Sequence, residues 1–513
     1  FKDGTKSVKF SWSGPAEVVF SNFSDIESSM KINKTGLMMW VYNTEPMSEP
    51  VRFTFLDWNM NEICHFDFNA DFKGWRAIWM KYIDMLSPYG HYGDKNLKER
   101  VTEAAGMIMK MPESAKSGTI YFDRVTFSMT KIHDQTTPDR QIPENNYNLE
   151  RDMWQWCRLW EWEQYAPIEV KAVNPEQVKM LKTVEERMDA WARTGNPGKE
   201  YTAGTLLGRV DGYFAKYGIR RLPDGSVTGA PLLSDDEFNN SLGEMRIRFI
   251  QEIVYWLSLD YMYTGNTSNL QRVIDAMDHA IDQGFAYGSG QGTNHHYGYQ
   301  VRDLYKGIWI LRKELAKAGK LDEYVKVLSY WSGLQETRMP YEQTRDGILD
   351  AWHTLHMAKV ISAMLQPTDA DKYAAMKALG KWTSGSLCYT DGTLGGVKVD
   401  GTSFHHGGHY PAYSVGAFAV LGDYCWFTEG TDFVIDEPAR RVFKHTLMTL
   451  RDYCNLREWG VGVSGRHPFN GDIPEKDVSA FARLALLGDL TGSGAEADPE
   501  LGGAYLALEG KDK

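Results

Sequence analysis

The first part of the chain has short apolar segments separated by Gly, Pro, Asn and Asp. The β-rich segments are VKFSWSG, AEVVFSNF, GLMMWVYN, VRFTFLDW, GWRAIWMKY and GTIYFDRVTFSM. In the last segment Val125 and Phe127 alternate with polar neighbours, as on a half-buried sheet. Many short strands with polar turns are typical of a β-sandwich, so we expect this fold over residues 1–135.

A polar segment follows this region. Residues 133–148, HDQTTPDRQIPENNYN, contain proline and show no apolar period. Such composition predicts a linker, which we place at residues 136–150 between two domains.

After the linker the apolar period changes from two to 3.6, which indicates helices. Residues 267–284 show this most clearly: Thr267 or Ser268 can cap the helix and Gly284 can end it, and one apolar stripe contains Leu270, Val273, Ile274, Met277 and Ile281. The same pattern predicts helices near 174–194, 237–263, 301–317, 321–331, 346–365, 369–382, 413–427, 435–454 and 476–487.

About ten helices joined by short Gly-containing loops predict stacked antiparallel hairpins. Because the sequence shows no fixed repeat, we expect a closed or partly closed helical toroid over residues 151–490 rather than a regular solenoid. Residues 491–513 are Gly-rich and weakly patterned, so we expect a linker cut short or the start of a further domain.

Composition narrows the function. The formal net charge of −12 excludes a protein that holds nucleic acid through its overall field, so a polyanionic ligand would need a locally basic cleft. The five cysteines are widely spaced without a CxxC pair and indicate neither a structural zinc nor a dense disulfide framework. Aromatic residues are abundant and suit the faces of sugar rings as well as cores. We interpret the aromatic segment GWRAIWMKY as a packed strand rather than a sugar site.

Three Gly-rich loops contain the candidate chemistry. The first, GSGQGTNHHYGYQVRD, contains Asn294, His295, His296 and Tyr297. The second, DGTSFHHGGHYPAYSVGAF, contains His405, His406, His409 and Tyr413, and the third, GVGVSGRHPFNGD, contributes Arg466. Glycine costs backbone entropy, so repeated Gly beside His, Tyr, Asn and Arg favours a backbone shaped for a ligand.

Zinc is one alternative for the second loop. His405, His406 and His409 could converge on a metal ion. In the helical zinc motif, however, a regular helix presents the histidines, whereas Gly407, Gly408 and Pro411 interrupt any helix here.

The second and third loops carry a resemblance to a known family. The stretch FHHGGHYPAYSVGAF, with His406 and Tyr413 seven residues apart, followed by Arg466 in GVSGRHP, resembles the polysaccharide lyases of family 8, specifically the broad-specificity chondroitin sulfate ABC lyases. The segment NHHYGYQVRD looks like the NWWDYEIG-type segment of the family. The resemblance covers the whole chain and implies a lectin-like β-sandwich (jelly roll) followed by an incomplete α/α toroid.

The resemblance implies cleavage of chondroitin sulfate and dermatan sulfate by β-elimination at the uronic acid. Tyr413 and His406 would act as acid and base, with Tyr413 giving a proton to the bridging O4, and Arg466 would supply a fixed positive charge. His295 stands where many family members have the Asn that neutralises the carboxylate, and Asn294 precedes it. If both C5 epimers are substrates, two bases are needed, and His295 or His296 and His406 could serve them differently.

Further residues take binding roles by the same resemblance. His296 and Tyr297 replace the tryptophan pair of the family's aromatic patch, and we expect Asn294, His296, Tyr297 and His405 to contact substrate. The resemblance also implies a C-terminal β-sheet domain, missing from this chain, whose Glu completes the site. A structural calcium or other divalent cation is expected in the sandwich, with Asp123 as a ligand, and no organic cofactor is implied.

Two alternatives from other classes remain open. The same loops could hold a glycosaminoglycan without cleaving it, or His405, His406 and His409 could serve a zinc-dependent hydrolase. The sequence contains no long apolar run, so we expect no membrane span, and its net charge gives no reason to expect a nucleic-acid partner. The chain opens without a leader, so we expect that any export signal has been removed or never existed, and the resemblance implies a periplasmic or secreted protein.

Overall fold

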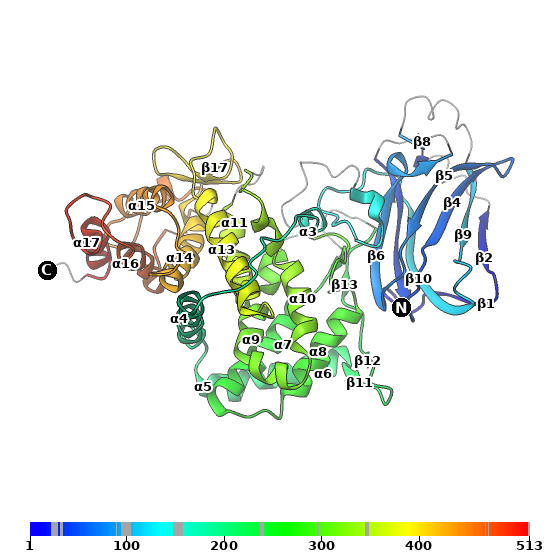
Figure 1. Cartoon of the computed structure of the whole chain (residues 1–513), viewed down its shortest axis with the longest axis horizontal. Coiled ribbons are helices and arrows are strands. Elements are labelled where there is room, and N and C mark those ends of the chain that lie inside the picture. The colour runs from blue at the N-terminus through cyan, green and yellow to red at the C-terminus, as the bar shows by residue number, and fades with distance from the viewer. Residues whose placement is uncertain are drawn as a thin grey trace. The chain divides into compact units, whose positions relative to one another are not determined.

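The chain folds into two compact units in a computed structural model (Figure 1). The structure describes residues 1–21, 29–30, 34–88, 90–93, 104–146, 157–235, 241–294, 297–343, 348–466, 468–469 and 471–510. The first unit contains residues 1–161, 205–254 and 268–300, and the second contains residues 162–204, 255–267 and 301–513. Within the described ranges we find no helix that is long and apolar enough to span a bilayer.

The first unit contains the predicted β-sandwich, which is confirmed. One sheet has the order β1-β10-β3-β6, formed by β1 (Val8–Ser13), β10 (Ser117–Phe127), β3 (Gly36–Asn43) and β6 (Gly74–Lys81). The other has the order β2-β9-β4-β5-β7-β8, formed by β2 (Glu17–Ser21), β9 (Ala104–Lys110), β4 (Val51–Asp57), β5 (Glu62–Phe68), β7 (Leu86–Ser87) and β8 (Gly90–His91). All of these strands pair antiparallel.

The two sheets share one core. Alternate side chains of β3 and β4, such as Met39 and Phe53, are buried in it. Phe127 packs against this core as expected, but Val125 is exposed, although the alternation put both on one face. The register of β10 against β3 shifts between Asp123 and Thr126, and this irregularity breaks the alternation. The segment GWRAIWMKY is packed, as expected: Trp79 on β6 is buried, and its indole N–H donates to the Thr137 carbonyl.

The segment predicted as a linker differs from that expectation where the structure describes it. Thr136, Thr137 and Gln141 are buried rather than solvated. Asp139 accepts hydrogen bonds from the backbone N–H groups of Gln141 (2.9 Å) and Gly290 (3.0 Å), which tie the segment to the first Gly-rich loop. Burial raises the pKa of Asp139 to about 6, although Arg76 and these donors oppose the rise. Hydrogen bonds, not an apolar period, hold this segment, which explains why its pattern resembles a linker.

The helices mostly follow the predicted ranges. They are α3 (Leu159–Glu163), α4 (Pro175–Ala192), α5 (Lys199–Tyr201), α6 (Leu207–Tyr217), α7 (Arg248–Thr264), α8 (Leu270–Asp282), α9 (Tyr297–Lys317), α10 (Leu321–Trp331), α11 (Leu349–Thr354), α12 (His356–Met364), α13 (Asp369–Ser386), α14 (Pro411–Thr428), α15 (Glu437–Asp452), α16 (Ser479–Ala485) and α17 (Pro499–Leu508). The helix predicted at 346–365 is divided at Leu355 into α11 and α12. Neither Thr267 nor Ser268 caps α8, whose N-cap is Asn269.

In the second unit the helices pack both on their neighbours in the chain and on helices further along it. Helix α12 contacts α10 and α13, α13 contacts α15, and α14 contacts α11 and α16. Aromatic side chains such as Trp331, Trp352 and Trp382 fill the space between them. This packing confirms the predicted fold class of a sandwich followed by a helical region.

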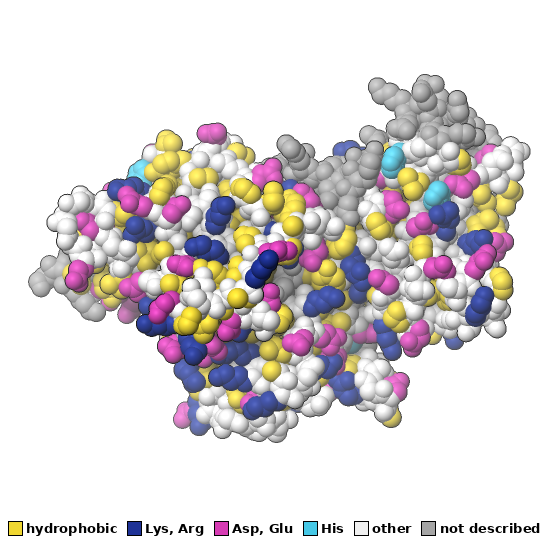
Figure 2. Space-filling model, in the orientation of Figure 1, with side chains coloured by type: hydrophobic (Ala, Val, Ile, Leu, Met, Phe, Trp, Pro, Cys, Tyr) yellow, Lys and Arg dark blue, Asp and Glu magenta, His cyan; other side chains and the backbone are white. Residues whose placement is uncertain are grey.

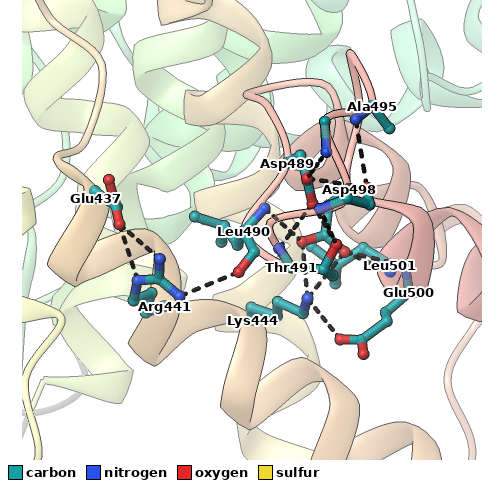
Figure 3. Close-up of polar contacts among 12 residues, drawn as sticks. Glu437, Arg441, Lys444, Asp489, Leu490, Thr491, Ala495, Asp498, Glu500 and Leu501 are labelled. Carbon is teal, nitrogen blue, oxygen red and sulfur yellow. Dashed lines mark hydrogen bonds and ion pairs between the residues drawn. The ribbon is translucent and has the colours of Figure 1, made fainter.

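The end of the chain also differs from the expected linker. Residues 499–508 form α17, which packs on α15 and α16. Figure 3 shows how it is held: the Asp498 carboxylate accepts hydrogen bonds from the backbone N–H groups of Glu500 and Leu501, caps the helix, and forms an ion pair with Lys444 (2.7 Å). The apolar pattern of residues 491–513 is too weak to predict this helix, because its cap and its packing on other helices stabilise it.

Candidate active site

His406 lies at the tip of a short hairpin in the second unit. Strand β16 (Ser403–His405) pairs with β15 (Gly396–Val397) and with β17 (Gly408–His409), and His405 faces Gly408 in the ladder. Only His406 and Gly407 connect β16 to β17, and both have positive φ (53° and 77°). A two-residue turn of this kind matches the twist of its strands, and it leaves the His406 side chain exposed.

Tyr413 lies in the first turn of α14, directly after this hairpin. Pro411 begins the helix, which suits a position whose N–H has no helical partner. The Tyr413 side chain is half-buried, and its ring centroid is 6.2 Å from that of His406. The planes of the two rings lie at 67°.

Arg466 is brought to the same hairpin by a close backbone contact. Gly465 has φ +70°, and a Cβ at this position would lie 2.1 Å from the His409 carbonyl oxygen. Only glycine fits there, so the loop is held against His409 and Tyr410. Burial raises the pKa of Tyr410, and the Arg466 guanidinium opposes the rise. Arg466 is itself exposed and able to meet an anion.

The sequence-predicted residues His406, Tyr413 and Arg466 therefore belong to one neighbourhood. Its centre is His405, whose ring stacks on Tyr413 at 4.4 Å and 21° and lies 4.0 Å from the ring of His406. The His405 side chain is fully buried, so the structure gives it a supporting position rather than the substrate-facing position expected for it. Tyr410 completes the ring cluster, 5.1 Å from Tyr413.

Sequence reasoning missed two residues beneath the cluster. Asp350 and His353 lie three residues apart on one face of α11. The Asp350 carboxylate is 3.8 Å from His405 Nε2, and the His353 ring meets the Tyr413 ring edge-on at 6.2 Å. Titratable side chains at helical spacing within an apolar helix are a signal that could have identified them.

The first Gly-rich loop belongs to the other compact unit. There Asn294 is buried, and its side-chain amide donates to Thr137 Oγ1 and to the Gly290 carbonyl. Tyr297 is also buried, at the start of α9. His295 and His296 lie outside the described residues. A substrate-binding role for these four residues stays a prediction.

The geometry gives no support to the zinc alternative. The part of the chain that the structure describes contains no group of three His, Cys, Asp or Glu side chains able to hold a metal ion. The ring of His409 instead meets that of Tyr453 at 5.3 Å.

The surroundings of Asp123 do not fit a calcium site either. Its carboxylate accepts hydrogen bonds from the backbone N–H groups of Lys2 (2.7 Å) and Arg124 (2.9 Å) and from the Ser7 hydroxyl (2.9 Å). Calcium needs six or more oxygen ligands, and N–H donors compete for this carboxylate. A structural cation elsewhere in the protein stays a prediction.

Charged side chains of both signs act on the ring cluster, with Asp350 and Asp400 among the acidic ones. Figure 2 shows basic and acidic side chains interspersed over the visible face. Arg302 and Lys476 both act on His353, where their positive charges lower a pKa that burial has already reduced, to about 4 in all. Arg302, Lys476 and Arg466 are all exposed.

Two family models match the chain. The model described as "Lyase, N terminal" matches residues 1–144, and the model described as "Lyase, catalytic" matches residues 168–513.

Curated relatives align over the whole chain. The chondroitin sulfate ABC exolyase of Bacteroides thetaiotaomicron is 27% identical over 538 residues, which are 100% of this chain and 50% of the relative. The chondroitin sulfate ABC exolyase of Proteus vulgaris is 24% identical over 99% of this chain and 52% of the relative. The chain thus spans about half the length of the curated relatives that it matches.

Two solved structures align less closely. Paenibacillus xanthan lyase gives a TM-score of 0.46 at 16% identity, over 65% of this chain and 32% of that chain. Streptomyces coelicolor chondroitin AC lyase, in complex with chondroitin sulphate, gives a TM-score of 0.38 at 14% identity, over 68% of this chain and 43% of that chain.

Proposed function

Because this chain belongs to polysaccharide lyase family 8, we propose that it carries the acid, base and cationic residues of an enzyme that cleaves chondroitin sulfate and dermatan sulfate by β-elimination. Three supports meet in this proposal. They are the match to the catalytic family model, the relatives named as chondroitin sulfate ABC lyases, and the cluster of His406, Tyr413 and Arg466.

The chemistry of the substrate sets the roles of these residues. The C5 hydrogen of a uronic acid lies next to a carboxylate, so its removal is feasible only where positive or hydrogen-bonding groups neutralise that charge. Arg466 is the exposed guanidinium of the cluster and can bind the carboxylate through its planar fork. A base then takes the C5 proton, the electron pair forms the C4=C5 double bond, and the C4–O4 bond breaks.

We assign both ends of this step to Tyr413. As a phenolate it can accept the C5 proton, and as a phenol it can donate a proton to the departing O4. His406 is the second candidate base, and its exposed position at the hairpin tip faces solvent, where a polymer can reach it. The single observation that carries the proposal is that both side chains and the Arg466 loop converge on one hairpin.

Acceptance of both C5 epimers requires bases on opposite faces of the sugar ring. We assign these roles to His406 and to one of His295 and His296, following the family resemblance. Asn294 or His295 would neutralise the carboxylate in the same arrangement. The elimination itself does not call for an organic cofactor.

The same resemblance implies partners beyond these residues. A β-sheet domain that supplies a glutamate would complete the site. Measuring the lyase activity of the present chain alone tests whether that domain is needed. Rapid turnover by the chain alone would remove the need for that domain. The polymeric substrates lie outside the cell, so we place the protein in the periplasm or among secreted proteins, which fractionation of the source cells can test.

The deciding experiment identifies the product. Chondroitin sulfate is incubated with the protein, and the masses of the fragments are measured by mass spectrometry. Binding of the protein to the same polymer is measured in parallel. Elimination gives fragments lighter by one water than hydrolysis does, and a chelator should not change their nature. Binding without fragments would favour a non-catalytic glycosaminoglycan-binding protein, and chelator-sensitive hydrolytic fragments would favour the zinc hydrolase.

A further inference from the structure

Helix α11 lies directly behind the ring cluster. It packs against α14, the helix that carries Tyr413 and, three residues later, Gly416. A Cβ at Gly416 would lie 2.6 Å from His353 Nε2, so the two helices approach closely because position 416 has no side chain. This approach brings His353 against the edge of the Tyr413 ring and aligns Asp350 with His405.

The pair of Asp350 and His405 is buried. The exposed fractions of the two side chains are 8% and 0%, and Asp350 Oδ2 lies 3.8 Å from His405 Nε2. A carboxylate in such a place is costly unless a positive or donating group compensates it, and a protonated imidazole does so. The same Coulomb attraction favours the protonated form of the histidine.

His405 stacks on Tyr413. The two rings are nearly parallel, with centroids 4.4 Å apart. An imidazolium in this position is attracted to the face of a phenol ring, and it is attracted more strongly when the phenol is ionised.

We propose that Asp350 is a positioning residue that acts on Tyr413 through His405: the carboxylate keeps the imidazole protonated and stacked, and the imidazolium favours the ionised form of Tyr413. That Tyr413 then accepts the C5 proton rests on the proposed function. The effect of Asp350 on the ionisation of Tyr413 does not.

Other titratable groups near Tyr413 could also change its ionisation, so the test must distinguish their effect from that of His405. From its own loop, His406 and Tyr410 face it, and the loop of Arg466 packs against Tyr410. From α11, burial lowers the pKa of His353 to about 4, Arg302 and Lys476 add to the fall and Asp350 opposes it, so this imidazole is neutral at neutral pH and Asp350→Asn leaves it neutral. His405 is the imidazole that both stacks on Tyr413 and faces a carboxylate, that of Asp350.

The sign of one substitution separates the proposal from its simplest rival. Removal of the Asp350 charge by Asp350→Asn would, through direct Coulomb interaction alone, make Tyr413 easier to ionise. If Asp350 acts through His405, the imidazole loses its proton and Tyr413 becomes harder to ionise. The two routes predict opposite shifts.

The measurement is a pH titration of the protein with ¹³Cζ-labelled tyrosine, followed by NMR, with the Tyr413 signal assigned by Tyr413→Phe. We expect Asp350→Asn to raise the midpoint of Tyr413 by about one pH unit, a tenfold change in its ionisation equilibrium. Asp350→Glu should restore the wild-type midpoint. Asp432→Asn is the matched control: Asp432 accepts the hydrogen bond of Tyr373, so that variant should move the Tyr373 signal and leave Tyr413 unchanged.

An unchanged or lowered Tyr413 midpoint in folded Asp350→Asn overturns the proposal. If that variant fails to fold, His405→Gln replaces it: removal of the imidazolium should raise the midpoint, and an unchanged midpoint is again contradictory. No substrate takes part in the titration. A failure here is therefore distinct from a failure of the lyase proposal, which the product analysis tests.

Discussion

His405 stacks on Tyr413 with ring centroids 4.4 Å apart and ring planes 21° apart. His405 ends strand β16, and Tyr413 lies in the first turn of α14, which begins at Pro411. The contact fixes the plane of the proposed catalytic phenol against a side chain that solvent does not reach. The reaction geometry therefore depends on the packing below the surface as much as on the exposed residues.

The packing of α11 on α14 predicts the effect of filling the space at Gly416. In Gly416→Ala the new methyl group would lie 2.6 Å from the His353 ring, so we expect a loss of about 1–3 kcal/mol in the free energy of unfolding. Chemical denaturation measures it. The matched control is Gly212→Ala in α6, where a Cβ meets nothing within 4 Å.

The control should gain about 0.5–1 kcal/mol, since alanine loses less backbone entropy than glycine in a helix. Equal stability of Gly416→Ala and the wild type would show that the two helices do not depend on this close approach.

From the burial of His356 we predict that the free energy of unfolding falls in acid. Within the described residues neither of its ring nitrogens has a hydrogen-bond partner, and burial, aided by Lys359, lowers its pKa to about 3. In the unfolded chain a histidine titrates near ~6.5. The stability from keeping His356 neutral is complete above that pH and falls as pH drops toward the folded pKa, by up to about 1.4 kcal/mol per pH unit.

Denaturation at stepwise lower pH measures this dependence, and His356→Leu should make the fall shallower. His445→Asn is the control, because His445 hydrogen bonds to Tyr389 at the surface. The same slope in His356→Leu and the wild type would assign the acid sensitivity to other groups.

Asp498 predicts the stability of the last helix. It caps α17 through two backbone N–H groups, accepts the N–H of Leu490 and pairs with Lys444, all while buried (Figure 3). Asp498→Ala leaves these donors without an acceptor and should cost about 3 kcal/mol. Hydrogen exchange of the α17 amides measures the loss. Glu500→Ala removes only the exposed partner of Lys444 and should cost under ~1 kcal/mol; an equal loss in both variants would contradict the capping account.

The proposed roles of the histidines predict which base acts on each C5 epimer of the uronic acid. If His406 and one of His295 and His296 act on different faces of the uronate, substitution of each by Ala should change the ratio of chondroitin to dermatan cleavage in opposite directions. A general base contributes a hundredfold or more, so we expect ratio changes of at least about tenfold. Initial rates on both polymers measure them. A parallel fall of both activities in every variant would show that one base serves both epimers.

Much of the fold could be predicted from apolar spacing. Helix α10 has the predicted bounds, because its stripe is regular and its ends carry clear signals. Helix α6 was not predicted: Gly208 and Gly212 weaken its helical pattern, and contacts such as the stacking of Tyr217 on Phe249 (3.8 Å) come from another part of the chain. The buried segment around Asp139 was also missed, because backbone hydrogen bonds leave no apolar period.

The site likewise contains residues that the sequence identifies and residues that it does not. His406, Tyr413 and Arg466 could be found because glycine-rich loops and a family spacing surround them. Asp350 and His353 offer only the weak signal of their helical spacing, because their contacts with the site come from the packing of α11 on residues more than fifty positions later in the chain. Contacts between distant segments leave no mark in the local pattern.

The most direct test of the central claim is the rate at which the protein generates ultraviolet absorbance from chondroitin sulfate, since the C4=C5 double bond conjugated to the carboxylate absorbs there. We predict a rate for the wild type that Tyr413→Phe lowers by at least about a hundredfold, while Tyr505→Phe, a substitution in α17, leaves it unchanged. A Tyr413→Phe variant with the wild-type rate would contradict the assignment of this phenol to the elimination.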